Sequence, residues 1–181
     1  MKRFSQLFVI LVLAACASSP KLNYYTLSAE SSGNSQPAVT LDVQRFQTTE
    51  ALSRSGILIA ASPTRVEYYA TDHWVSSVGE LVQQKFQAEF GPHVAGRPTY
   101  ELSGKVTAFE QVDRGGVTET RMAVDVVIRD PSKKRFEAPL LEQSFNATET
   151  AAAGNADAVA QSLSKSAEKI AAEIVAALAK F

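Results

Sequence analysis

Residues 100–129 read YELSGKVTAFEQVDRGGVTETRMAVDVVIR, a long run in which apolar and polar side chains alternate. Alternation of this kind is typical of strands with one buried and one wet face. The first half places four side chains on the buried face: Tyr100, Leu102, Val106 and Ala108. The second half places six there: Thr118, Thr120, Met122, Val124, Val126 and Ile128. Because Asp113-Arg114-Gly115-Gly116 supplies a turn between them, the run predicts a long antiparallel hairpin.

Shorter runs on both sides of this hairpin predict further strands. Before it, alternating or aromatic and β-branched residues bounded by turn residues predict strands at 23–27, 39–46, 57–61 and 65–69, with a polar loop at 28–37. After it, Leu141, Phe145 and Ala147 indicate one more strand. The expected order is therefore four strands, a helix, three strands and a second helix.

Two amphipathic helices complete the pattern. Thr71 or Asp72 is expected to cap the first helix, and Gly91-Pro92 ends it. Its apolar face comprises Trp74, Val78, Leu81, Val82, Phe86 and Phe90. The second helix runs from a cap at Asn155 or Asp157 to about Ala179, with a buried stripe of Val159, Leu163, Ile170, Ile174 and Leu178. Separated helices with hairpins between them predict a single-domain α+β sandwich, a mostly antiparallel sheet carrying both helices on one face.

The N-terminus has the pattern of a secretion signal. Lys2 and Arg3 precede an apolar run, residues 7–15, that is too short to span a bilayer. The run ends Leu13-Ala14-Ala15-Cys16, which resembles the lipobox of bacterial lipoproteins. We expect residues 1–15 to be removed as a signal peptide and Cys16 to carry diacylglycerol and an N-acyl chain such as palmitate. Residues 16–22 would then be a lipidated tether and 23–181 a periplasmic domain. An ordinary secretory signal ending near a cysteine is the alternative.

Cysteine count and charge narrow the function classes. Cys16 is the only cysteine, so the mature domain has no disulfide and depends on an apolar core. Loss of Lys2 and Arg3 reduces 18 basic side chains to 16 against 19 acidic ones, a formal charge of −3. Nucleic acid is therefore not an expected partner. The one basic cluster, Lys133-Lys134-Arg135, follows Asp130-Pro131 and is interpreted as a solvated hairpin tip, with a phosphate or headgroup site as the alternative.

The sequence contains no catalytic or metal-binding motif. His73 and His93 are not at ligand spacing, and no nucleophile elbow, zinc-protease motif or phosphate loop occurs. Glu110 and Asp113 lie near a hairpin tip, where solvated charges are common. We therefore expect a protein that is not an enzyme and that uses no metal and no cofactor apart from the lipid on Cys16.

Several short segments, taken in order, resemble one known family. They are the lipobox, Tyr24-Tyr25-Thr26-Leu27, the segment from Ile57 to Tyr68 (Ile-Leu-Ile, then Ser-Pro and Val-Glu-Tyr), and Asp72 with Trp74 opening the first helix. This succession resembles the ABC-type transport auxiliary lipoproteins, the PqiC-like family. The resemblance implies an outer-membrane lipoprotein that maintains membrane integrity by working with an inner-membrane ABC transporter and permease and a periplasmic MCE-domain protein to move lipid. Ala17, which is not the aspartate of the inner-membrane retention signal, agrees with the outer membrane.

Five aromatic residues are candidates for an interface or for lipid contact: Tyr24, Tyr25, Tyr68, Tyr69 and Trp74. Ordinary core and sheet packing is the alternative for each of them. A ring-like homo-oligomer would suit the role, although no residue pattern sets a symmetry. Two other functions stay open: a structural or assembly lipoprotein for an outer-membrane barrel, and a periplasmic hydrolase with a deep polar cleft around His73 or His93.

Overall fold

The long hairpin forms the centre of the sheet. The computed structural model describes residues 20–134 and 136–180. Strands β6 (Thr99–Arg114) and β7 (Val117–Arg129) pair antiparallel, and β8 (Leu141–Thr150) continues that order from β7. The turn is made by Gly115 and Gly116, with φ of 57° and 86°. Glycine adopts this left-handed conformation without a steric penalty, so the predicted turn is confirmed.

The other side of β6 is shared by three strands in succession. β2 (Thr40–Val43), β3 (Gln47–Thr48) and β4 (Gly56–Ser62) each pair with it in parallel. The 3₁₀ turn η1 (Glu50–Ser53) connects β3 to β4. β4 and β5 (Arg65–Trp74) form the second antiparallel hairpin, and β1 (Asn23–Tyr25) pairs with the end of β5. The result is an eight-stranded mixed sheet in the order β1-β5-β4-β6-β7-β8, with β2 and β3 beside the first half of β6.

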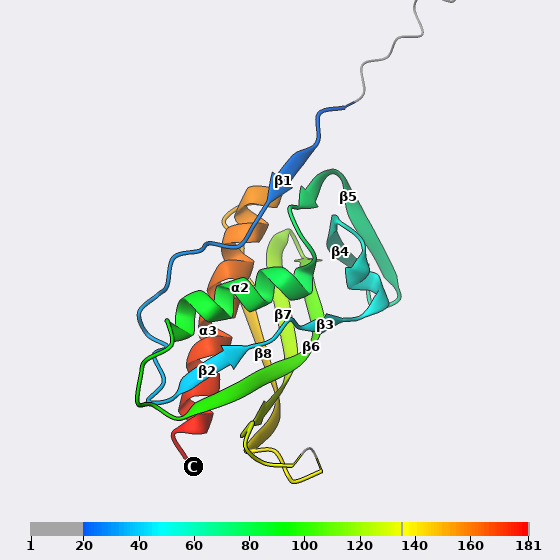
Figure 1. The fold of residues 1–181 in the computed structure, drawn as a ribbon. Helices are drawn as coiled ribbons and strands as arrows, with labels where there is room; N and C mark the ends of the chain where they lie inside the picture. Colours follow the sequence, from blue (N-terminus) through cyan, green and yellow to red (C-terminus); the bar gives the residue numbers. More distant parts are fainter. Residues whose placement is uncertain (1–19, 135, 181) are drawn as a thin grey trace, which may run out of the picture.

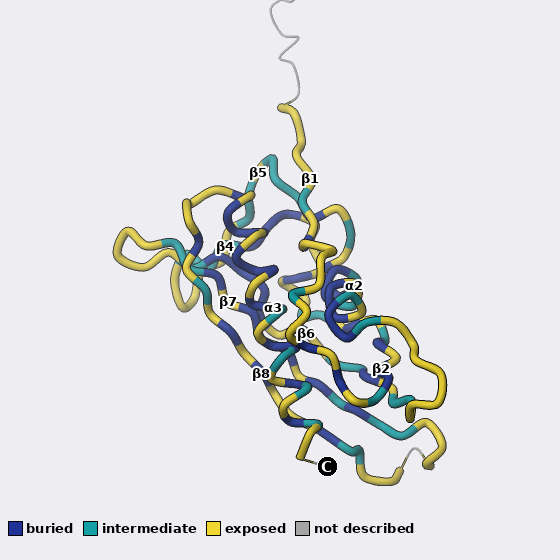
Figure 2. The backbone as a smooth tube through the Cα atoms, turned by 90° about the vertical axis from the view of Figure 1, so that its left-hand side faces the viewer, coloured by how far each residue is buried: buried dark blue, intermediate teal, exposed yellow. Residues whose placement is uncertain are grey.

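Two helices cover one face of this sheet (Figure 1). α3 (Ala156–Leu178) packs on β7 and β8, while α2 (Val78–Phe90) packs on β2, β3 and β6 and touches α3. Their apolar faces and the inner side of the sheet form one buried core, which Figure 2 shows as the dark centre of the tube. The predicted α+β class is confirmed.

The first helix begins later than the sequence predicted. Ser77 is its N-cap, in place of Thr71 or Asp72, and Trp74 is the last residue of β5. The reason is that the backbone at the end of β5 is already used by the sheet, since β1 pairs with residues 72–74 and β4 with His73. The other helix boundaries are close to those predicted. Gly91, with φ of 79°, ends α2, and the Asn155 side chain accepts a hydrogen bond from the Ala158 N–H at 2.9 Å.

A β-bulge in β6 changes which side chains reach the core. Val106 pairs with Val124 and Phe109 with Met122, so three residues of β6 span two of β7. The bulge therefore brings Phe109, opposite Met122, into line with the buried row, while Ala108, opposite Ala123, is buried as predicted but lies on the other side of the strand. Simple alternation could not reveal this shift, because a bulge reverses the phase without interrupting the apolar composition.

Candidate functional site

Strand β1 determines where the chain leaves the domain. Tyr24 lies opposite His73 and Tyr25 opposite Trp74, and the Val75 N–H donates to the Tyr25 carbonyl at 2.9 Å. Residues 20–22 therefore extend from the end of the molecule at which β1 and β5 meet (Figure 1). Cys16 and the predicted signal peptide, residues 1–15, lie outside the described residues.

Asp72 holds β1 in place through its carboxylate. Its Oδ1 accepts hydrogen bonds from Asn23 Nδ2 at 2.9 Å and from the Tyr25 hydroxyl at 3.1 Å, and its Oδ2 accepts one from Thr71 at 3.0 Å. The hydrogen bond from Asn23, supported by those from Thr71 and Tyr25, outweighs burial and lowers the pKa of Asp72. Burial and the neighbouring Asp72 raise the pKa of Tyr25. Tyr25 therefore has a structural role in attaching the first strand.

The five aromatic candidates do not form one cluster. Trp74 is only 3% exposed and packs on Phe109 with 5.1 Å between ring centroids, so it is a core residue. The Tyr68 hydroxyl donates to the Ala51 carbonyl of η1 at 2.8 Å, and the Tyr69 hydroxyl donates to Gln111 Oε1 at 2.6 Å. These two hydrogen bonds connect β5 to η1 and to β6.

Tyr24 differs from the other four because its side chain is 62% exposed. Its ring lies 6.1 Å from that of His73. Two further apolar side chains are exposed at this end, Leu22 at 45% and Val75 at 60%. We call Leu22, Tyr24 and Val75 the tether-end patch. The sequence did not identify Val75 as an exposed apolar residue. The helical spacing that starts at Trp74 predicts a helix here, with Val75 outside its apolar face.

A groove of about 750 Å³ runs beside β1. Segment 24–29 forms one wall, and α2 and α3 form the others. Leu27, Leu81 and Ala160 contribute apolar surface, while Gln84, Lys165 and Glu168 contribute polar groups. Tyr24 and Tyr25 also line the groove, so the tether-end patch and the groove are continuous.

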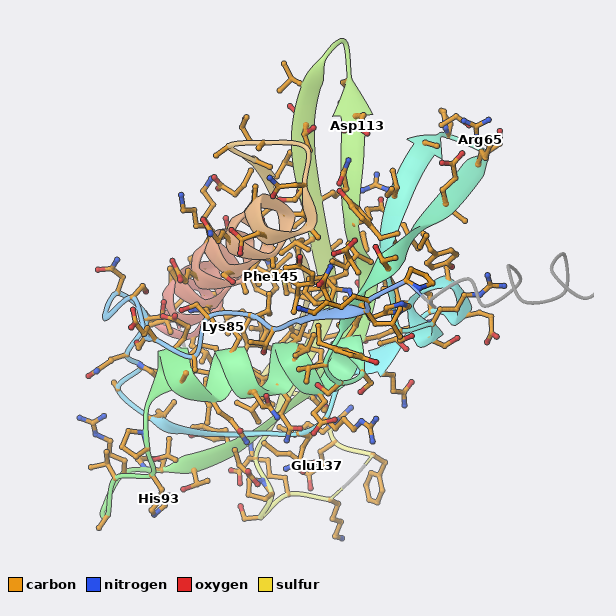
Figure 3. The ribbon with its side chains drawn as sticks, turned by 90° about the horizontal axis from the view of Figure 1, so that it is seen from above. Arg65, Lys85, His93, Asp113, Glu137 and Phe145 are labelled. Carbon is orange, nitrogen blue, oxygen red and sulfur yellow. The ribbon has the colours of Figure 1, made fainter. Side chains whose placement is uncertain are left out.

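Lys85 in this groove belongs to a buried cluster of charges. Its Nζ lies 2.8 Å from Glu89 Oε1 and 2.8 Å from Glu168 Oε1, and it donates to the Glu30 carbonyl at 2.7 Å. The side chains of Lys85 and Glu89 have no exposed area. Figure 3 shows Lys85 between the two helices, under the N-terminal segment. The cluster therefore joins α2, α3 and the loop before β2.

Glu89 holds that loop directly. The Ser32 N–H donates to Glu89 Oε1 at 3.0 Å, and the Ser32 hydroxyl donates to Oε2 at 2.7 Å. Burial disfavours the charged form of this carboxyl, but the hydrogen bonds from Lys85 and Ser32 outweigh it, so the pKa of Glu89 lies below its ordinary value. The sequence did not reveal the cluster, because Lys and Glu four residues apart on a helix are usually a solvated pair.

The titratable groups considered from the sequence are separated in space. His73 Nδ1 lies 3.1 Å from Ser55 Oγ, and His93 lines an open groove beside β2. Glu110 is paired with Arg121, while Asp113 accepts hydrogen bonds from Gln111 and Thr118. In the part of the chain that the structure describes, no three His, Cys, Asp or Glu side chains are grouped to hold a metal ion. Among these same residues, no helix has the length and apolarity to cross a bilayer.

Solved structures share this fold. A crystal structure of an uncharacterized protein superposes with a TM-score of 0.67 at 12% identity, covering 88% of this chain and 99% of the other. A Xanthomonas campestris protein of the family DUF330 superposes with a TM-score of 0.70 at 15% identity, covering 84% and 92%. No curated protein matches the sequence significantly.

The family comparison covers most of the domain. The model of the ABC-type transport auxiliary lipoprotein component matches residues 25–175. This range begins in β1 and ends in the last turns of α3, so it includes the buried charge cluster, both hairpins and every groove residue except Tyr24. The family is one of transport auxiliary lipoproteins and is not known for catalysis. The chain belongs to the ABC-type transport auxiliary lipoprotein family.

Proposed function

We propose that this chain is the lipid-anchored auxiliary subunit of an ABC transport system that moves lipid through a periplasmic MCE-domain protein and maintains the outer membrane. The observation that carries the proposal is the family match over residues 25–175, directly after a lipobox ending at Cys16. In this proposal the subunit is an adaptor without catalytic activity. Energy enters through the partner's cytoplasmic ATPase, since the periplasm supplies no ATP.

The anchor is the covalent lipid proposed on Cys16. A diacylated and N-acylated cysteine carries more than one chain, and at about 0.8 kcal/mol per buried methylene this gives lasting attachment. The anchored domain is confined to a thin layer beside the outer membrane. Weak contacts with a transport partner then act at a high effective concentration.

The tether-end patch is the part of the domain that we propose to meet the membrane surface. Only five residues lie between Cys16 and Leu22, so an extended tether of six Cα-to-Cα steps spans at most about 20 Å. Tyr24 has an amphipathic ring suited to the interface between headgroups and water, with Leu22 and Val75 beside it. Of the five aromatic candidates, Tyr24 is the one to which we assign lipid contact.

The anchoring proposal can be tested on the lipidated protein in nanodiscs. Cys16 is the only cysteine, and in the lipidated protein its sulfur carries the lipid, so an introduced cysteine is the only thiol that a spin label can modify. The label is placed at Val75→Cys or, as a matched control, at Val117→Cys beside the β6–β7 turn. We expect the label at residue 75 to be more accessible to membrane-soluble oxygen than the label at residue 117. Equal accessibility to oxygen would exclude the patch as a membrane contact.

The transport proposal has a genetic test. We expect deletion of the gene, and separately Cys16→Ala, to sensitise cells to detergent, and we expect the protein to co-purify with an MCE-domain protein. Mass spectrometry of the mature wild-type protein checks the lipid. Detergent resistance equal to wild type in both strains would refute the proposal. Co-purification with a β-barrel and without an MCE-domain protein would favour the assembly lipoprotein.

A further inference from the structure

The described residues of the loop between β7 and β8, 130–134 and 136–140, lie far from β1. Figures 1 and 2 both place it at the end of the molecule opposite β1. If the tether end faces the anchoring membrane, this loop faces away from it. We call residues 130–134 and 136–140 the distal loop.

The acidic groups of the distal loop are used to fix its own backbone. Asp130 Oδ1 accepts hydrogen bonds from the Ser132 N–H at 2.9 Å and from the Ser132 hydroxyl at 2.7 Å. Glu137 Oε1 accepts one from the Lys134 N–H at 3.0 Å, and the Glu137 carbonyl accepts one from Arg129 at 2.8 Å. Figure 3 labels Glu137 on this loop. The loop therefore has a defined shape, and both carboxylates are turned to internal partners.

The side chains of Lys133, Lys134 and Phe136 point to solvent instead. Lys133 and Lys134 are exposed, and within residues 20–134 and 136–180 neither is paired with a carboxylate. Phe136 is 85% exposed, the most exposed of the large apolar side chains described, and Lys134 Nζ lies 5.7 Å from its ring centroid. Aromatic side chains are enriched at the core of protein interfaces, and charged side chains at the rim steer association with a surface of opposite charge.

A hollow of about 580 Å³ lies beside the loop. Tyr100, Glu101 and Ser103 of β6 line it, together with Pro131 and Pro139. The two prolines restrict the backbone at both ends of the loop and so reduce the entropy that binding would remove. The distal loop thus combines a prearranged shape, two exposed lysines that pair with no carboxylate of the described residues, an exposed ring and a recess.

We propose that the distal loop docks on an acidic protein surface that has an apolar recess for Phe136, and that this surface belongs to the periplasmic partner of the transport system. The inference depends on the proposed function, because that function supplies a protein partner on the side away from the anchor. The lysines provide long-range attraction to acidic groups of the partner. The ring of Phe136, exposed in the free protein, provides the short-range contact once it enters the recess of the partner. An anionic membrane would attract the lysines as an acidic protein surface does. The loop, however, could reach such a membrane only on the side of the domain opposite the tether.

The test uses the full lipidated protein in phosphatidylcholine nanodiscs and the purified periplasmic region of the MCE-domain protein as the probe. The loop variants are Phe136→Ser and the double variant Lys133→Glu/Lys134→Glu. Val117→Ser and Lys165→Glu are matched controls, because both positions are exposed and lie outside the loop. Melting temperatures equal to wild type establish that each variant is folded.

We expect each loop variant to weaken the binding of the probe by about tenfold or more, while the controls bind like wild type. Raising the salt concentration should weaken wild-type binding more than that of the double variant, since salt screens the lysines. Loop variants that bind like wild type would overturn the docking proposal and leave the proposed function intact. A wild-type protein that does not bind the probe would count against the proposed function itself.

A parallel measurement separates a protein surface from a lipid surface. Phosphatidylglycerol vesicles replace the probe, and co-sedimentation with the nanodiscs is measured. We expect no co-sedimentation that depends on Lys133 and Lys134. Sedimentation abolished by Lys133→Glu/Lys134→Glu, together with unchanged binding of the MCE-domain probe, would assign the loop to an anionic membrane and overturn the proposal.

Discussion

The two helices lie side by side on one sheet, yet different interactions hold them there. α3 buries alanine, serine and aliphatic side chains, and no buried residue of Ala156–Leu178 is charged. α2 buries Lys85 and Glu89 among its apolar residues. Their N-termini differ as well, because the Asn155 side chain caps α3, whereas Ser77 makes no side-chain cap bond at α2.

This difference shows how each helix finds its position. An apolar stripe is stabilised by the area it buries, which many small displacements preserve. A buried ion pair is stabilised only in one geometry, because each charge needs its partner and its hydrogen bonds. We therefore expect the charge cluster and, through Ser32, the loop before β2 to fix the position of α2.

Lys85→Met should have the largest effect. It leaves Glu89 buried without its cation, and breaking a buried pair from one side costs about 3–5 kcal/mol. Urea unfolding of the mature protein measures the loss. Lys165→Met, an exposed residue at the same groove, is the control and should change stability by less than about 0.5 kcal/mol. Equal effects of the two substitutions would mean that the buried pair does not position α2.

Protonation of Glu89 in acid should lower the stability of the protein less than Lys85→Met does. The folded pKa of Glu89 is lowered, so its contribution to stability is complete above its ordinary value of 4.5 and is lost as the pH falls below it. A neutral carboxyl still accepts hydrogen bonds from Ser32, and this limits the loss. Urea midpoints between pH 7 and pH 3 should fall more steeply for wild type than for Glu89→Gln. Parallel curves would show that Glu89 does not titrate with the folding equilibrium.

The contrast between the helices also explains what could be read from the sequence. α3 was predicted almost to the residue because its apolar spacing and its Asn155 cap are local signals. The turn at Gly115 and Gly116 was equally accessible, since only glycine suits its backbone. Local chemistry determines these features, so no knowledge of distant contacts was needed.

The features that sequence analysis missed depend on contacts between distant segments. Trp74 fits a helical pattern, but β1 and β4 pair with the backbone beside it and keep it in a strand. Lys85 is buried because Glu30 and Glu168, 55 and 83 residues away, reach it. Among the candidate contact residues, the sequence could not tell the exposed Tyr24 from the buried Trp74, and lipid contact by Tyr24 stays a prediction. Lipidation of Cys16 stays a prediction.

Gly79→Ala tests the close approach of α2 to the sheet connection. A Cβ there would lie 2.0 Å from the Phe46 carbonyl oxygen, a backbone atom that cannot move freely. Helix propensity alone favours alanine by about 1 kcal/mol, so the clash must outweigh it. We expect a net loss of about 1–3 kcal/mol in urea unfolding. Gly154→Ala, whose nearest contact is the Thr118 hydroxyl at 3.1 Å, should cost less, and a stabilised Gly79→Ala variant would mean that α2 can move away from Phe46.

The caps give the smallest difference between the helices. Asn155→Ala removes the bond to the Ala158 N–H and should cost about 1 kcal/mol. Ser77→Ala removes only an exposed hydrogen bond from Arg45 and should cost a few tenths of a kcal/mol, by the typical size of solvent-exposed polar contacts. Urea midpoints of the two variants compare them directly. If Ser77→Ala proved as costly as Asn155→Ala, α2 would depend on its N-terminus as much as α3 does, and the two helices would not differ in their caps.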